Sequence, residues 1–94
     1  MSVEAGQSAG GGDSPLFAVL GAGSWGTALS MQLIRSGSRV VLWDIDSDHM
    51  LAMAASRCNE KFLPDTPLPD ELVLETDLET AVRAADEILI VVPS

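Results

Sequence analysis

The feature that most constrains this chain is a glycine-rich segment, Gly21-Ala22-Gly23-Ser24-Trp25-Gly26, which separates two different kinds of hydrophobic pattern. Before it lies the short apolar run Leu16–Leu20, and such a run bounded by glycines is typical of a strand buried on both faces. After it, residues 25–36 carry apolar side chains close to the i, i+3, i+4 spacing of a helix with one buried side. The segment therefore predicts a strand, a tight glycine turn and a helix in immediate succession.

The remainder of the chain repeats this alternation of strand and helix. The predicted elements are a strand at 39–44, a helix from Asp46 or Ser47 through Arg57, a strand at 72–75, a helix opened by a capping box at 76–79, and a strand at 88–92. Three prolines within residues 64–69 exclude a continuous helix or a central strand there, so residues 58–71 are predicted to form a loop. The predicted fold class is α/β: a partial Rossmann-type doubly wound parallel sheet of about four strands in the order 3-2-1-4.

The glycine spacing also predicts a ligand. In a turn of this kind Gly21 permits the sharp bend, Gly23 lets the backbone approach a pyrophosphate, and Gly26 lets the helix pack closely on the strand. Free amides at the helix N-terminus attract the phosphates without any basic side chain. Asp44 lies 21 residues after Gly23 at the end of the second predicted strand, where a carboxylate accepts hydrogen bonds from adenine-ribose hydroxyls. The alternative is purely structural: the glycines close a turn and Asp44 starts the next helix.

The residue type at Asp44 bears on which dinucleotide is bound. A carboxylate there repels the 2′-phosphate of NADP, and the following residue, Ile45, offers no cation to pair with that phosphate. NAD is therefore favoured over NADP, with Arg39 a weak candidate for contacting the phosphate.

Charge and composition exclude several other classes of function. Five Lys and Arg residues against fourteen Asp and Glu residues give a net charge of −9, which disfavours nucleic acid and anionic membranes as partners. No apolar run is long enough for a transmembrane helix, and no basic segment precedes one as in a signal peptide. One Cys and one His offer almost no ligands for zinc, so no metal site is predicted, and the single Cys is consistent with a reducing cytoplasm.

Three further side chains have a structural and a functional interpretation. His49 is interpreted as a solvated surface residue, since no second His and no suitably placed Ser accompanies it. Cys58 is interpreted as a small packing residue. Trp43 fits either a strand-end core position or a stacking position beside an adenine.

The motifs together resemble the N-terminal part of bacterial NAD(P)-dependent glycerol-3-phosphate dehydrogenases. The resemblance spans nearly all of residues 17–94 and is carried by four blocks: Ala18–Leu29, Val41–Trp43, Arg57–Asn59 followed by Phe62–Asp65, and Val91–Ser94. The first block is shared by many dinucleotide enzymes, whereas the loop and the Val-Pro-Ser ending are more specific.

The resemblance implies reversible reduction of dihydroxyacetone phosphate to sn-glycerol 3-phosphate, for phospholipid synthesis in the cytoplasm. It places Ser24 and Trp25 against the pyrophosphate and Ile45 at the adenosine end, where the family often has a basic or polar residue. The predicted cofactor-binding residues are Gly21, Gly23, Ser24, Trp25, Gly26, Asp44 and Ile45. The implied partners are the nicotinamide dinucleotide and a small phosphorylated substrate, with a homodimer left open.

The resemblance also implies what this chain lacks. The family is understood to use lysines beyond the fourth strand, whereas the only lysine here, Lys61, has no matching catalytic role. We therefore assign no catalytic residue. Residues 1–14, rich in Gly, Ser and Ala, are expected to be a disordered tail, and residues 15–94 the N-terminal part of a dinucleotide-binding domain without its catalytic C-terminal domain. The 94 residues alone are expected to be inactive.

Two alternative functions stay open at this point. One is another Rossmann oxidoreductase, of the ketopantoate or hydroxy-acid reductase kind. The other is a stand-alone dinucleotide-binding module. The strand at 88–92 is almost wholly apolar and becomes an exposed sheet edge if nothing follows Ser94, which argues against a self-sufficient module.

Overall fold

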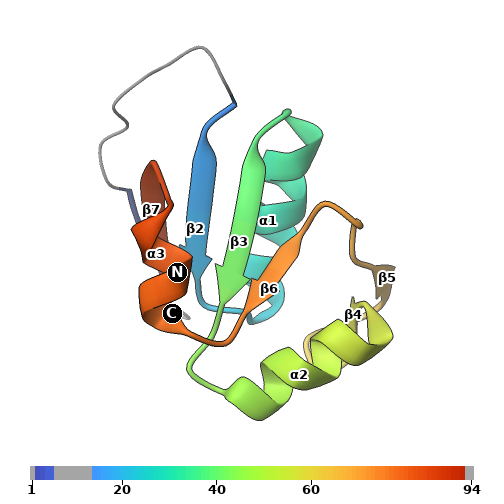
Figure 1. The fold of residues 1–94 in the computed structure, drawn as a ribbon. Helices are drawn as coiled ribbons and strands as arrows, with labels where there is room; N and C mark the ends of the chain where they lie inside the picture. Colours follow the sequence, from blue (N-terminus) through green and yellow to red (C-terminus); the bar gives the residue numbers. More distant parts are fainter. Residues whose placement is uncertain (1, 6–13, 93–94) are drawn as a thin grey trace.

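A five-stranded sheet in the order β1-β7-β2-β3-β6 forms the centre of the computed structural model, which describes residues 2–5 and 14–92 (Figure 1). Strands β2 (Leu16–Leu20), β3 (Arg39–Trp43), β6 (Val73–Glu75) and β7 (Glu87–Val92) run parallel to one another. The order β6-β3-β2-β7 is the predicted order 3-2-1-4. The predicted partial Rossmann-type sheet is thus confirmed.

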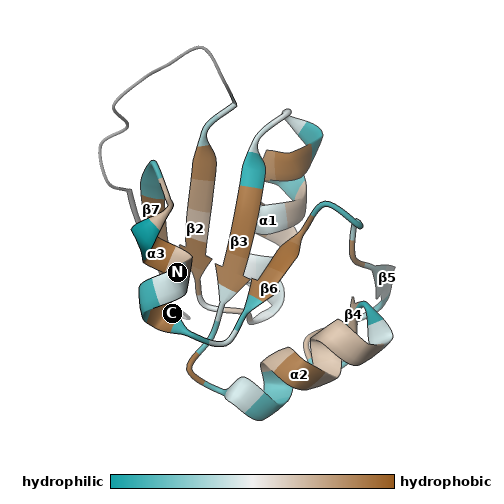
Figure 2. Cartoon of the chain, viewed as in Figure 1, coloured by the Kyte–Doolittle hydropathy of each residue, from teal (hydrophilic) through white to brown (hydrophobic). Residues whose placement is uncertain are grey.

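Helices cover both faces of the parallel strands. Helix α3 (Leu78–Arg83) lies on one face, and α1 (Ser24–Arg35) lies on the other, with α2 (Ser47–Ser56) beyond the carboxyl ends of the strands (Figure 1). Successive strand residues face opposite layers: Ala18 and Val41 pack with Ala81 of α3, whereas Val19 and Leu42 belong to the larger core. That larger core also includes Met31, Met50, Met53, Leu68, Leu72, Leu89 and Val91. Burial on both faces explains why β2 and β3 are almost uniformly hydrophobic (Figure 2).

Strand β1 corrects one prediction. Residues 1–14 were expected to form a disordered tail, but Ser2–Ala5 forms β1, which pairs antiparallel with β7 from Ser2↔Val92 to Ala5↔Leu89. That expectation is wrong for these four residues. The carbonyl of Ser14 accepts hydrogen bonds from the Arg39 guanidinium, and residues 1 and 6–13 lie outside the described residues. Because β1 takes up the free side of β7, the strand at 88–92 is not an open sheet edge.

Helix α3 begins one residue later than its predicted capping box. Asp77, and not Thr76, is the N-cap, and its carboxylate accepts a 2.9 Å hydrogen bond from the Thr80 amide. A hydrogen bond from the Thr80 hydroxyl is the main reason that the pKa of Asp77 lies below its usual value. Glu79, the other half of the predicted box, pairs instead with Arg83.

The proline-rich segment after α2 contains a strand pair that was not predicted. Strands β4 (Cys58–Asn59) and β5 (Leu63–Pro67) form a separate two-stranded antiparallel sheet within the predicted loop. Arg57 ends α2 in the left-handed conformation, and its guanidinium donates hydrogen bonds to the carbonyls of Pro69 and Leu72 at 2.6 and 3.0 Å. These contacts fix the β4–β5 hairpin beside the carboxyl ends of the sheet strands.

Candidate functional site

The turn after β2 requires glycine at two positions for reasons internal to the protein. Gly21 has φ +128°, and a Cβ added there would lie 2.3 Å from the Val91 carbonyl oxygen. A Cβ added at Gly26 would lie 1.7 Å from the Gly21 carbonyl oxygen, because the first turn of α1 packs directly on the turn. These contacts agree with the predicted roles of Gly21 in the bend and Gly26 in close packing.

Gly23 is different, because no contact among the described residues requires a glycine there. Its φ is −76°, a value that any residue adopts, and within residues 2–5 and 14–92 no heavy atom other than those of Gly23 and its chain neighbours lies within 4 Å of an added Cβ. The space beside Gly23 is therefore open, which is the condition for a ligand to approach its backbone closely.

Helix α1 begins at this open space with its first amides uncapped. Gly23 is the N-cap and supplies no side-chain hydrogen bond, and no acidic residue lies in the first turn. In contrast, α2 and α3 are capped by Asp46 and Asp77, whose carboxylates accept from the amides of His49 and Thr80. The unpaired amides of a helix N-terminus carry a partial positive charge and bind anions. Among the helices of the described residues, α1 alone presents this arrangement to a cavity.

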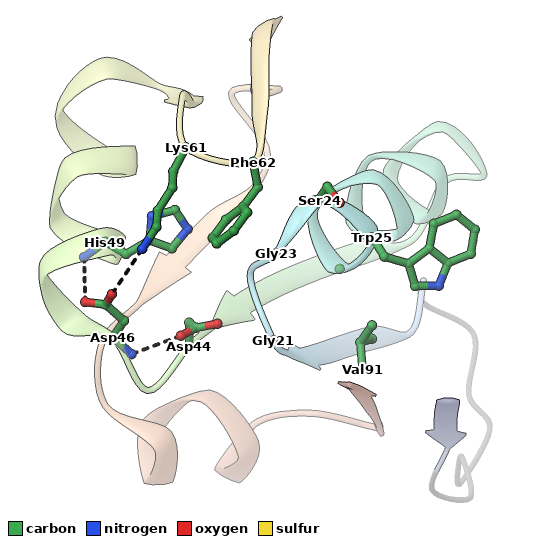
Figure 3. Close-up of a pocket in the computed structure, with 11 residues that line it drawn as sticks. Gly21, Gly23, Ser24, Trp25, Asp44, Asp46, His49, Lys61, Phe62 and Val91 are labelled. Carbon is green, nitrogen blue, oxygen red and sulfur yellow. Dashed lines mark hydrogen bonds and ion pairs between the residues drawn. The ribbon is translucent and has the colours of Figure 1, made fainter. Parts of the chain in front are cut away.

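The cavity at this N-terminus has a volume of about 350 Å³ (Figure 3). Its lining comes from the glycine turn, the ends of β3 and β7, the start of α2 and the β4–β5 hairpin. The lining residues are Gly21, Gly23, Ser24, Trp25, Gly26, Asp44, Asp46, His49, Lys61, Phe62 and Val91. Six of the seven predicted cofactor-binding residues are in this set; Ile45 is not, and 87% of it is exposed to solvent.

Asp44 connects the glycine turn to the start of α2. Its Oδ2 accepts a 2.7 Å hydrogen bond from the Ala22 amide, and its Oδ1 accepts a 2.9 Å hydrogen bond from the Asp46 amide. Since a carboxylate has about four acceptor positions, both oxygens retain capacity for a ligand. Asp44 does not start the next helix, because the N-cap of α2 is Asp46. Asp44 instead holds the glycine turn against the start of α2 and borders the cavity.

Lys61 and Phe62 line the cavity although sequence analysis gave them no role in it. The Lys61 ammonium lies 4.0 Å from Asp46 Oδ2 and 5.2 Å from the centre of the Phe62 ring. Lys61 is the only Lys or Arg among the described residues that line the cavity. A Lys-Phe pair in a loop is too common in protein sequences to indicate a binding site. The β4–β5 hairpin, which turns Lys61 and Phe62 toward α2, was not predicted.

The interpretation of His49 as a solvated residue is wrong. Only 8% of it is exposed; its Nε2 lies 3.0 Å from the Ala22 carbonyl oxygen, and its ring meets that of Phe62 edge-on at 5.4 Å. The cause is the position of α2, whose first turn is held against the glycine turn by Asp44 and capped by Asp46.

The other two ambiguous side chains have packing positions. Trp43 donates a 3.1 Å hydrogen bond from Nε1 to the Thr76 carbonyl and packs with the cluster beneath α3, away from the cavity lining. Cys58 is half-buried in β4. No helix within the described ranges 2–5 and 14–92 has the length and apolar character needed to cross a membrane.

Comparison with known proteins shows which family the sequence of this chain matches. A family model described as the N-terminus of NAD-dependent glycerol-3-phosphate dehydrogenase matches residues 17–94. The chain is 55% identical to glycerol-3-phosphate dehydrogenase [NAD(P)+] of Pectobacterium atrosepticum and 57% identical to that of Cronobacter sakazakii, each over 76 residues. Each match covers 81% of this chain and 22% of the relative.

A solved structure agrees with these sequence matches. The crystal structure of glycerol-3-phosphate dehydrogenase from Coxiella burnetii superimposes with a TM-score of 0.72 at 42% identity, over 77% of this chain and 22% of the other. The chain thus spans only about a fifth of the length of these relatives. Residues 17–94 correspond to the N-terminal region of the NAD-dependent glycerol-3-phosphate dehydrogenase family, and the chain belongs to that family.

Proposed function

We propose that this chain binds a nicotinamide dinucleotide in the cavity at the start of α1. The observation that carries the proposal is the open space beside Gly23 in front of the uncapped amides of Ser24 and Trp25. The pyrophosphate would contact these amides, and the adenine ribose would lie toward Asp44. Six of the seven residues predicted for this role line the cavity, and Trp25, 52% exposed, offers an apolar surface beside the pyrophosphate position.

Within the protein that carries this chain, the bound cofactor would serve reversible hydride transfer between NAD(P)H and dihydroxyacetone phosphate, giving sn-glycerol 3-phosphate for phospholipid synthesis. The relatives named for this reaction support the proposal. When bound, the nicotinamide supplies or accepts the hydride. The part proposed for this chain is to hold and orient the dinucleotide. We assign the proton donor and the groups that bind the substrate phosphate to the part of the relatives that this chain does not match.

We propose that NAD is preferred over NADP. The Asp44 carboxylate borders the cavity and would repel a 2′-phosphate, and Ile45 offers no positive charge. Lys61 is the one feature of the lining that would favour the phosphate, although its ammonium already lies 4.0 Å from the Asp46 carboxylate. Titration of the protein with NADH and NADPH under the same conditions tests this preference, and tighter binding of NADPH contradicts it.

We place this function in the cytoplasm, with a small phosphorylated substrate and no nucleic-acid or membrane partner; a homodimer is compatible with it. The net charge of −9 supports the exclusion of polyanionic partners.

A second candidate, a stand-alone dinucleotide-binding module, is favoured by one observation. Strand β1 covers β7, so the apolar strand that argued against a self-sufficient unit is paired on both sides. Measurements of NADH binding and NADH oxidation on the protein at its natural length distinguish these functions. NADH oxidation that depends on dihydroxyacetone phosphate supports the dehydrogenase. NADH binding without that oxidation supports the module, and oxidation with a hydroxy-acid precursor instead supports another Rossmann oxidoreductase.

A further inference from the structure

The carbonyl group of Ala22, inside the glycine turn, is held by two side chains from different parts of the chain. The Asn59 amide, at the end of β4, donates from Nδ2 at 3.0 Å, and the His49 ring, in the first turn of α2, approaches with Nε2 at 3.0 Å. Since a carbonyl oxygen only accepts, His49 must carry a proton on Nε2. Two donors from outside the turn therefore converge on one peptide group of the nucleotide-binding segment.

The side chain of Asn59 is fully buried, and both its amide nitrogen and its amide oxygen form hydrogen bonds. Its exposed fraction is 0%, its Nδ2 also donates to the Thr27 hydroxyl at 2.8 Å, and its Oδ1 accepts from the Phe62 amide at 3.2 Å. The partners settle which end of the side chain is which, because the Ala22 carbonyl needs a donor and the Phe62 amide needs an acceptor. One side chain thus joins the glycine turn, α1 and the wall of the cavity.

These contacts determine how the turn presents its amides. The peptide group between Ala22 and Gly23 is planar and trans, so fixing the direction of its carbonyl fixes the opposite direction of the Gly23 N–H. On the other side of Ala22, its own amide is held by Asp44 at 2.7 Å. The main-chain hydrogen bonds of the turn are at its two ends: the Gly21 N–H donates to the Trp43 carbonyl in β3, and the Thr27 N–H in α1 donates to the Gly23 carbonyl. The orientation of the Ala22–Gly23 peptide therefore depends on side chains outside the turn.

We propose that Asn59 and His49 are positioning residues for dinucleotide binding. They hold the Ala22–Gly23 peptide so that the Gly23 amide and the first amides of α1 converge on one pyrophosphate, and Asn59 sets the cavity wall at Phe62 relative to that point. The inference rests on the proposed dinucleotide function. It adds that the β4–β5 hairpin is part of the binding apparatus, although Asn59 itself is not in the cavity lining.

The experiment compares Asn59→Asp with wild type in the protein at its natural length. Aspartate keeps the size of asparagine and its acceptor for Phe62, but it removes both donors and sets an oxygen against the Ala22 carbonyl. We expect the Kd for NADH to rise about tenfold or more, with KM for NADH rising more than kcat falls. Cys58→Ala is the matched control, because Cys58 lies in the same strand, is half-buried and directs its thiol to the Leu63 carbonyl, 3.9 Å away within the hairpin.

The stability of each variant is measured beside binding, by urea unfolding. A merely structural role for Asn59 predicts lower stability with unchanged affinity in the folded fraction, and that result would overturn the inference. If wild type itself does not bind NADH, the proposed function fails and the inference fails with it. If wild type binds NADH and folded Asn59→Asp binds it equally well, the inference alone is wrong.

His49 provides a second test should Asn59→Asp not fold. His49→Gln keeps an N–H donor near the position of Nε2, whereas His49→Leu keeps bulk and removes the donor. We expect His49→Leu to weaken NADH binding severalfold and His49→Gln to restore most of it. Equal NADH affinity of the two His49 variants would contradict a role for the donated hydrogen bond.

Discussion

Substitution of Gly23 by alanine separates ligand binding from folding. The backbone φ at Gly23 is −76°, which alanine adopts without strain, and its added Cβ would have no neighbour within 4 Å in the part of the chain that the structure describes. Alanine is a poorer N-cap than glycine but restricts the unfolded chain more, so these opposing effects leave stability within about 1 kcal/mol of wild type. The fold is therefore expected to tolerate Gly23→Ala.

Binding is expected to respond very differently. The new methyl group would occupy the space through which a pyrophosphate approaches the first amides of α1. Overpacking of a close contact costs about 1–3 kcal/mol, which corresponds to a loss of NADH affinity of about fivefold to 150-fold. Gly23→Ala should thus keep its stability within about 1 kcal/mol of wild type while losing most of its NADH affinity.

Gly26→Ala is the matched control, because we expect this substitution to lower the stability of the protein strongly. Its Cβ would lie 1.7 Å from the Gly21 carbonyl oxygen, so backbone atoms must separate by more than an ångström. We expect a loss of about 3 kcal/mol or more of unfolding free energy, beyond the gain of about 1 kcal/mol from replacing glycine within a helix.

The assay is thermal unfolding of wild type and both variants, followed by titration of the folded proteins with NADH. Unchanged NADH affinity in Gly23→Ala would refute the assignment of the open space to the pyrophosphate. A large stability loss in the same variant would refute the claim that the protein itself leaves that space empty.

Three further predictions concern cofactor choice, a helix cap and the first strand. Asp44→Asn should raise the affinity for NADPH relative to NADH by about tenfold, because a charge that repels the 2′-phosphate is removed. Lys61→Gln should lower the same affinity ratio, because a positive charge is removed. Paired titrations of each variant with both cofactors measure the ratio. Asp77→Ala should lower the melting temperature at neutral pH, because the cap of α3 is lost. Since the folded pKa of Asp77 lies below its ordinary value of 3.8, the part of this difference due to ionisation is complete above 3.8 and disappears as the pH falls through the folded pKa, and melting curves across that range measure it. Deletion of residues 1–5 should speed amide hydrogen exchange in β7, because its partner β1 is removed; exchange rates equal to those of wild type would contradict the pairing.

The central elements were predictable because local patterns determine them. Residues 16–20 form β2 as expected, since an apolar run ending in glycine is compatible with few structures other than a buried strand. Gly21 and Gly26 have the contacts that their spacing implied. The cap of α3 moved from Thr76 to Asp77 because Thr and Asp are both good N-caps and sequence alone does not choose between neighbours.

The features that were missed depend on contacts between distant residues. Strand β1 pairs through its main chain, so the small polar composition of its segment gives no signal of it. His49 is buried because its ring meets the Ala22 carbonyl, 27 residues away in sequence, and its local surroundings contain no trace of that contact. In the sequence, Asn59 is distinguished only by the family resemblance of its loop, because its hydrogen bonds to Ala22 and Thr27 form between segments that are more than 30 residues apart.

A crystal structure of the protein with NADH bound tests the central claim most directly. The account predicts pyrophosphate oxygens at the amides of Ser24 and Trp25, beside Gly23, with the adenine ribose near Asp44. NADH bound at any other surface, with the space beside Gly23 filled by solvent, would contradict it.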